Sequence, residues 1–205
     1  MGVLQPTRFG MKVLQVCTGR ARPLPTPGGT VLSAIAKQAV PGRVAVGPLG
    51  LEGDEQADLS VHGGLAKAVY AYPAEHLAFW QTVRAQARVA GWGQALAPGA
   101  LGENLLLQGL LESDLWVGDR LIVGAGSPGG GCVLVVSEPR HPCFKFAAAM
   151  GFAQATQLMW RSGFCGSFLA VLEPGFVQAG DGITLQPGPR EVSIRELFKS
   201  RAPRT

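Results

Sequence analysis

Glycine and proline interrupt this sequence so often that few stretches are long enough for a helix of ordinary length. Of its 205 residues, 29 are glycine and 15 are proline. Short apolar runs rich in β-branched side chains lie between them, such as 132–136, and this pattern is typical of buried strands joined by turns. The sequence therefore predicts a mainly β fold with a few peripheral helices.

Alternation and turn signals place the expected elements along the chain. Strands are expected at 11–17, 30–36, 43–46, 105–108, 132–136, 168–172 and 183–185, with a strand pair inside 115–123. Helices are expected at 73–89, 144–150 and 152–161, and a last short helix begins at a capping box of Ser193 and Glu196. The segment 20–29, which contains three prolines, is expected to be a loop. Many short strands with few helices predict a β-barrel decorated by helices.

Length and composition favour one compact domain, 1–205, with its core at about 10–190 and a short helix and basic tail at 191–205. Hydrophobic residues make up 47% of the chain and charged residues 16%, which excludes intrinsic disorder. The net charge of +4 suits an anionic cofactor. No basic, aromatic-interleaved motif predicts nucleic-acid binding. No apolar stretch is long enough for a signal peptide or a membrane span, so a cytoplasmic protein without membrane association is expected.

The four cysteines are far apart in the sequence. Cys17, Cys132, Cys143 and Cys165 form no C-x-x-C pair and no cluster with histidine at zinc spacing. Neither a disulfide scaffold nor a zinc site is predicted, and a reducing compartment is expected.

One cysteine stands in a chemically distinctive loop. Segment 137–145 follows the apolar run 132–136, and two prolines stiffen it around Arg140, His141, Cys143 and Lys145. A positive neighbourhood lowers the pKa of a thiol, and a thiolate is both a nucleophile and a soft metal ligand. Cys143 is therefore the candidate reactive residue. The alternative is an inert buried cysteine, which is the commoner kind.

A double glycine marks a second candidate site. Backbone N–H groups of Gly63 and Gly64 can approach a ligand closely and form an anion-binding nest, with the Lys67 ammonium nearby. A plain turn is the alternative reading.

Two histidines belong to this part of the sequence. His62 precedes the double glycine, and Asp54 or Asp58 would fix its tautomer if it moves a proton; otherwise these acids cap the turn. His76 lies in the expected helix 73–89 and is interpreted as a surface or packing residue.

Two polar residues follow the Gly/Pro loop 97–102. Glu103 and Asn104 stand where this loop enters the expected strand 105–108. Polar groups at such a junction are candidates to hydrogen-bond a substrate or cofactor, and turn chemistry is the alternative.

Together these motifs closely resemble the MOSC domain, the molybdenum-cofactor-sulfurase C-terminal domain, over about 10–190. The resemblance is closest to the YiiM subfamily of 6-N-hydroxylaminopurine resistance proteins. It is carried by GDEQA at 53–57, HGG at 62–64, KA at 67–68, YPAEH at 72–76, GEN at 102–104, VGD at 117–119 and PRHPCFK at 139–145.

The resemblance implies a β-barrel, a molybdenum cofactor (molybdopterin) and reduction of N-hydroxylated compounds such as N-hydroxylaminopurines. Cys143 matches the residue thought to hold molybdenum in that family. The interpretation assigns catalysis to Cys143, His62 and His141. It assigns cofactor binding to Arg140, Lys145, Lys67, Gly63, Gly64, Asn104, Glu103 and Asp58. Tyr72 or Phe144 is expected to stack on a flat base.

The expected partners are a small N-hydroxylated substrate and a separate electron-donor reductase, because the chain has no dinucleotide fingerprint and no iron–sulfur cysteine cluster. Two other readings stay open: a sulfur carrier with a persulfide on Cys143, and a barrel that only binds the cofactor. The oligomeric state also stays open, with a homodimer as one option.

Three departures from the family pattern bear on these expectations. Glu138 stands where glutamine is frequent, Gly166-Ser167-Phe168 replaces glycine followed by two aromatic residues, and the sequence stops soon after Lys199 where longer members continue.

Overall fold

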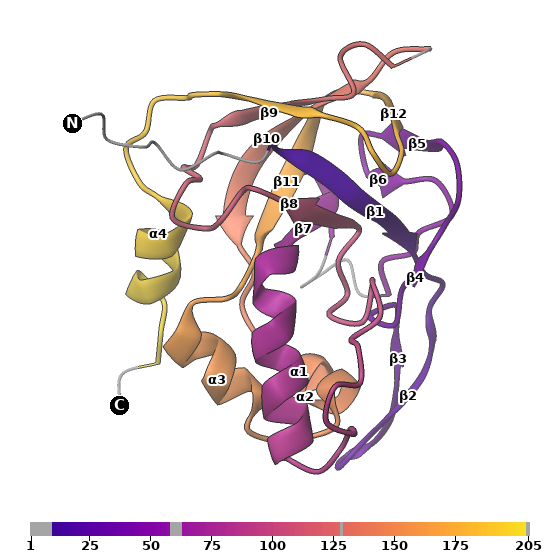
Figure 1. Cartoon of the computed structure of the whole chain (residues 1–205), viewed down its shortest axis with the longest axis vertical. Coiled ribbons are helices and arrows are strands. Elements are labelled where there is room, and N and C mark those ends of the chain that lie inside the picture. The colour runs from indigo at the N-terminus through magenta and orange to yellow at the C-terminus, as the bar shows by residue number, and fades with distance from the viewer. Residues whose placement is uncertain (1–9, 58–62, 128, 204–205) are drawn as a thin grey trace, which may run out of the picture.

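The computed structural model describes residues 10–57, 63–127 and 129–203 (Figure 1). The strands in these ranges are β1 (Lys12–Thr18), β2 (Arg22–Thr26), β3 (Gly29–Ser33), β4 (Gln38–Ala39), β5 (Val44–Gly47), β6 (Gly50–Leu51), β7 (Val69–Pro73), β8 (Leu105–Gln108), β9 (Arg120–Val123), β10 (Cys132–Pro139), β11 (Ser167–Glu173), β12 (Gly175–Val177) and β13 (Ile183–Gln186). The helices are the single turns η1 (Leu65–Lys67) and η2 (Ala74–His76), followed by α1 (Leu77–Gln86), α2 (Phe144–Met150), α3 (Ala155–Ser162) and α4 (Ile194–Ser200).

Eight of these strands form one curled sheet. Their order is β13-β9-β10-β11-β7-β8-β1-β4. Neighbours are antiparallel except β7 and β8, which run parallel because α1 lies in the connection between them. A bridge from Lys12 to Gly182 joins the start of β1 to the approach to β13, so the sheet curls back onto itself. The expectation of a mainly β, barrel-like fold with peripheral helices is confirmed.

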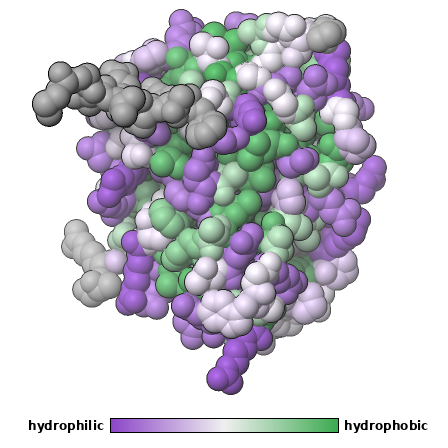
Figure 2. All heavy atoms as spheres, viewed as in Figure 1, coloured by the Kyte–Doolittle hydropathy of each residue, from purple (hydrophilic) through white to green (hydrophobic). Residues whose placement is uncertain are grey.

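The helices cover the sheet at one end and one side. In Figure 1, α1, α2 and α3 gather at the lower end, α4 lies beside the sheet, and the β2–β3 ribbon runs down the opposite side. Trp80 of α1, Phe146 of α2 and Phe198 of α4 are buried in one hydrophobic core cluster with the sheet residues Tyr72 and Leu134. On the face seen in Figure 2, hydrophilic residues dominate the outline and apolar residues show through the middle.

Local signals located many elements well. β1, β8 and α2 lie where the pattern predicted them, and α4 begins at the expected capping box, in which Ser193 and Glu196 bond each other's backbone. His76 proves to be a packing residue, because its side chain is buried and pairs with Glu112, the Nε2 to Oε2 distance being 2.7 Å.

The expected loop at 20–29 is wrong, because β2 pairs with β3 in a two-stranded ribbon. Its prolines, Pro23 and Pro25, are two residues apart, so both ring nitrogens face the same edge of the ribbon, where no partner strand is needed.

The expected strand pair inside 115–123 is also wrong. Only β9 forms there, and Trp116 makes an isolated bridge to Ser193. Strand β10 continues three residues beyond the expected end at Val136, and β12 forms directly after Pro174, where no strand was expected.

Candidate functional site

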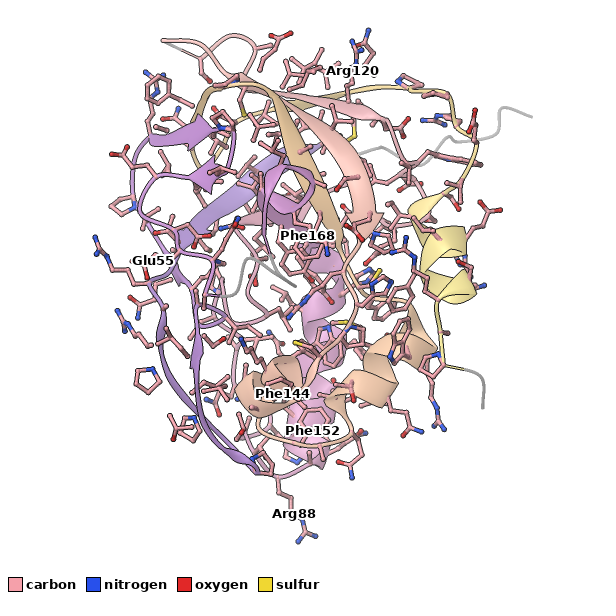
Figure 3. All side chains as sticks on the ribbon, turned by 180° about the vertical axis from the view of Figure 1, so that it is seen from behind. Glu55, Arg88, Arg120, Phe144, Phe152 and Phe168 are labelled. Atoms are coloured by element: carbon pink, nitrogen blue, oxygen red, sulfur yellow. The ribbon has the colours of Figure 1, made fainter. Side chains whose placement is uncertain are left out.

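A partly open cavity lies where the end of β10, the start of α2 and several loops converge. It has room for about 100 Å³ of solvent. Among the described residues its wall contains the thiol of Cys143, four cationic side chains (Lys37, Lys67, Arg140 and Lys145) and two carboxylates (Asp54 and Glu55). Figure 3 shows Phe168, another lining residue, at the centre of this face and Glu55 at its side. The excess of cationic groups favours an anionic ligand. We refer to this as the basic cavity.

Cys143 differs from the other three cysteines, and all four lie in the described part of the chain. It occupies the N-cap position of α2 and is partly exposed in the cavity wall. Cys17, Cys132 and Cys165 are buried. Burial raises the pKa of Cys17 and of Cys132 to about 12, with nearby carboxylates adding to the effect, so both remain thiols at neutral pH.

Arg140 lines the same cavity as Cys143, but its side chain is buried. Its side chain is 5% exposed. The guanidinium donates to the carbonyl oxygen of Leu101 at 2.6 Å and lies 4.9 Å from the ring centres of Tyr70 and Phe146. Burial tends to lower the pKa of Arg140, but its electrostatic interactions with Tyr70 and Cys143 and its hydrogen bond to Tyr70 outweigh this and raise the pKa overall. A permanent positive charge therefore stands beside the thiol.

Lys145 and Lys67 both line the cavity, from α2 and from η1. The Lys67 ammonium lies 3.6 Å from a carboxylate oxygen of Glu138 and 5.8 Å from the ring centre of Phe168. Glu138 also pairs with Arg201 beyond α4 at 3.2 Å. The departure from the family pattern at Glu138 thus places an acid between a cation of the cavity and one near the C-terminal helix.

The double glycine reaches the cavity through Gly63, and both glycines have positive φ values, 118° and 79°. This backbone conformation is accessible to glycine and strained for other residues. Gln56 holds the turn, since its Oε1 accepts from the Gly64 N–H at 3.2 Å and its Nε2 lies 3.4 Å from the Lys67 carbonyl oxygen. His62 and Asp58 lie outside the described residues, so their roles stay predictions.

Asn104 lines the cavity, but both polar atoms of its side chain make hydrogen bonds within the protein. Its Oδ1 accepts from the Tyr70 N–H at 3.0 Å, and its Nδ2 donates to the Cys17 carbonyl at 3.2 Å and to Asp54 Oδ2 at 2.9 Å. Asp54 also accepts from the Gly19 N–H at 2.8 Å and forms a buried ion pair with Lys37. Sequence reasoning missed Lys37, because nothing around it in the sequence indicates that Asp54 is its neighbour.

Glu103 does not line the cavity, which corrects its assignment to cofactor binding. Its side chain is fully buried and accepts from the N–H groups of Gly99, at 2.6 Å, and Leu101, at 3.1 Å. Burial raises the pKa of Glu103 despite these hydrogen bonds. The alternative interpretation is therefore the right one: Glu103 stabilises its own loop. The same loop contains Leu101, whose carbonyl oxygen accepts a hydrogen bond from Arg140.

His141 is also placed away from the basic cavity. Its ring stacks near Trp160 of α3 and Phe198 of α4, with centre distances of 5.5 Å and 6.0 Å. Its Nε2 is buried and has no hydrogen-bond partner among the described residues. Burial, followed by the charge of Arg201, lowers the pKa of His141. This position does not support the expected role in proton transfer.

Tyr72 cannot stack on a ligand. It is fully buried, and its hydroxyl donates to the Phe164 carbonyl and accepts from Trp80 Nε1 at 2.5 Å. Phe144 by contrast is 58% exposed.

No helix in the described part of the chain is long and apolar enough to span a membrane.

A curled β sheet with one partly exposed thiol in the wall of a basic cavity defines the class of protein as a barrel-like fold with a candidate anion-binding site. A family model described as the MOSC domain matches residues 58–184. The chain belongs to the MOSC domain family and is a homologue of YiiM.

Three relatives illustrate the similarity. Protein YiiM of Escherichia coli (strain K12) is 38% identical over 165 residues, which cover 80% of this chain and 68% of that protein. A protein named Reductase from Gibberella moniliformis is 34% identical over 200 residues, 96% of this chain but only 34% of the longer relative. The crystal structure of YiiM from Geobacillus stearothermophilus superposes with a TM-score of 0.70 at 28% identity, covering 92% of this chain and 82% of that one.

Proposed function

We propose that this chain holds a molybdenum cofactor through Cys143 and reduces N-hydroxylated compounds, such as N-hydroxylaminopurines, to amines. The observation that carries the proposal is a partly exposed thiol in the wall of a cavity that also contains Lys37, Lys67, Arg140 and Lys145. A thiolate is a soft ligand for a transition metal, and cations with glycine backbone N–H groups bind phosphate. The relative named Reductase supports the reaction class.

The chemistry of the described residues fits such a cofactor. The space fits it only if the cofactor extends from the basic cavity into the hollow beside it. The 100 Å³ of the basic cavity is below the roughly 300–1,000 Å³ of small-molecule sites, so its closed part takes only one end of the cofactor. An adjoining hollow of about 460 Å³ shares the residues 54–57 with it. A cofactor held by one thiolate needs no ligand cluster, and the described residues contain no group of three His, Cys, Asp or Glu side chains suited to a metal ion.

The reaction requires two electrons and two protons: R–NHOH + 2e⁻ + 2H⁺ gives R–NH₂ and water. The molybdenum cofactor, when bound, supplies the two electrons and accepts the oxygen atom. Residues of this chain position the groups. Arg140 keeps a buried charge beside Cys143, and the ammonium groups of Lys145 and Lys67 bind the anionic part of the cofactor. Electrons come from a separate reductase protein.

The test is expression in two hosts, one able and one unable to make molybdopterin. Wild type and Cys143→Ser are purified from each, with Cys132→Ala as the control that removes a buried sulfur outside the cavity. Molybdenum content is measured by elemental analysis, and N-hydroxylaminopurine reduction is measured with an artificial electron donor. Only wild type and the Cys132→Ala variant from the competent host should contain molybdenum and reduce the substrate.

Equal activity in every sample would refute the proposal. A mass increase of one sulfur atom on Cys143 without molybdenum would instead favour the sulfur-carrier reading. Protein that contains molybdenum but never reduces a hydroxylamine would favour a barrel that only binds the cofactor.

A further inference from the structure

A separate cavity lies between α3, α4 and the loop that follows β8. Its volume of about 320 Å³ is at the lower end of the roughly 300–1,000 Å³ of small-molecule sites. Among the described residues it shares no lining residue with the basic cavity. In Figure 1, α3 and α4 lie next to one another along one side of the molecule. We refer to it as the α3–α4 cavity, and its lining includes Glu112, Trp160, Arg161, Phe164, Arg195 and Lys199.

Three cationic side chains line this cavity without counter-ions. Arg161 belongs to α3, and Arg195 and Lys199 belong to α4. All three residues are exposed, and none forms an ion pair or a side-chain hydrogen bond within the described residues. Arg195 and Lys199 are four residues apart, so they are neighbours on one face of α4, where like charges destabilise a helix. The arrangement is unfavourable by itself and favours the binding of an anion.

The carboxylate in the described lining is engaged inside the protein. Glu112 is buried, its Oε1 accepts from the Gly166 N–H at 2.7 Å, and its Oε2 lies 2.7 Å from His76 Nε2. Because both carboxylate oxygens are occupied, Glu112 does not pair with the three cations. The lining therefore keeps an excess of positive charge.

Aromatic side chains form another part of the lining. Trp160 and Phe164 are both half-buried. The Trp160 ring stacks on Phe198 with a centre distance of 4.5 Å, and the Phe164 ring stacks on His76 at 3.7 Å. Both rings are therefore held in place by neighbours within the protein. A fixed aromatic ring binds a flat ligand at low entropic cost.

We propose that the α3–α4 cavity binds the phosphate monoester of a small aromatic molecule, with the phosphate among the three cations and the ring against Trp160 and Phe164. A phosphate monoester carries a charge of roughly −1.5 to −2 at neutral pH, which suits several cations better than the single charge of a carboxylate. Arginine also forms paired hydrogen bonds with phosphate oxygens. The inference does not depend on the proposed function, because the two cavities have no described lining residue in common.

The test is calorimetry on the full chain with three probes that separate charge from ring. Phenyl phosphate has both features, methyl phosphate has only the charge, and phenol has only the ring. Phenyl phosphate should bind with a Kd below about 1 mM. Methyl phosphate lacks the stacking contact and should bind about tenfold more weakly, and phenol should bind more weakly still.

Three variants place the bound probe. Arg195→Glu should weaken phenyl phosphate binding about tenfold or more, because it replaces a charged donor by an acid. The new acid stands four residues before Lys199, a spacing that stabilises a helix, so α4 should stay folded. Arg120→Glu is the matched control, since Arg120 is an exposed arginine on β9, outside the cavity lining and at the upper end of Figure 3. Arg120→Glu and Lys145→Ala, which changes the basic cavity, should both stay within about twofold of wild type.

Three results would overturn the inference. The first is the lack of saturable phenyl phosphate binding below about 1 mM. The second is binding that is lost in Lys145→Ala but kept in Arg195→Glu, because the probe would then occupy the basic cavity. The third is equal affinity for methyl phosphate and phenyl phosphate, because the aromatic rings would then contribute nothing to recognition.

Discussion

The ion pair of Lys37 and Asp54 offers a quantitative test of how the wall of the basic cavity is held. Both side chains are less than a tenth exposed, at 8% and 6%. Replacing Asp54 by Asn keeps an oxygen that can accept from the Gly19 N–H or the Asn104 amide. It leaves the Lys37 ammonium buried without a compensating charge. Breaking a buried ion pair from one side costs about 3–5 kcal/mol.

The assay is equilibrium urea denaturation followed by circular dichroism. With a denaturant slope of about 2 kcal/mol per molar urea, a loss of about 3 kcal/mol moves the midpoint down by about 1.5 M. The double variant Lys37→Gln with Asp54→Asn removes both charges and keeps two amides that can hydrogen-bond. It should recover about half or more of the loss, since the penalty comes mainly from the stranded charge.

Two results would contradict this reasoning. A midpoint for Asp54→Asn within about 0.3 M of wild type would mean that Lys37 reaches water easily when its partner is neutral. A double variant no more stable than Asp54→Asn would mean that the loss comes from the Gly19 and Asn104 hydrogen bonds and not from the charge pair.

Two further predictions concern the region around α4. Ser193→Ala removes the side-chain acceptor of the capping box and should cost about 1 kcal/mol of unfolding free energy in urea denaturation, whereas Ser193→Asp, which restores a cap, should cost less; equal losses would argue against capping. For His141 the folded pKa lies below its ordinary 6.5, so the unfolded chain binds the proton more readily and stability is lost as pH falls below 6.5 toward the folded pKa. Wild type should therefore lose unfolding free energy relative to His141→Phe between about pH 7 and pH 5 in parallel denaturation curves, and a difference that does not vary with pH would contradict the assignment.

The sequence predicts best those features that depend on neighbours in the chain. The capping box at Ser193, the helix after Cys143 and strand β8 each follow from a few adjacent residues. The location of the site was also predictable in part, because an accessible cysteine, a double glycine and several cations were already recognised in two short stretches.

Features that depend on contacts between distant segments were not predictable in the same way. The ion pair of Lys37 with Asp54 joins segments 17 residues apart, and the hydrogen bond from Arg140 to the Leu101 carbonyl spans 39. Glu103 is of a residue type that often binds ligands, but its carboxylate accepts hydrogen bonds from two N–H groups of its own loop. The segment of β2 was predicted as a loop because of its prolines. An edge strand tolerates proline, however, and β2 pairs with β3.

The direction of each side chain in the loop between β10 and α2 decides what the thiol can do. Arg140 points toward Tyr70 and the carbonyl of Leu101, while the next residue, His141, packs against the aromatic rings of α3 and α4. Both side chains are tied to the body of the protein, so the loop is anchored on two sides where it leads to Cys143. The sulfur is thereby held in the wall of the basic cavity, and it also lines a neighbouring hollow that contains Phe144, Phe152 and Trp160. The loop thus keeps the buried guanidinium of Arg140 and the thiol of Cys143 in the wall of one cavity, and the proposed binding of an anionic cofactor rests on this arrangement.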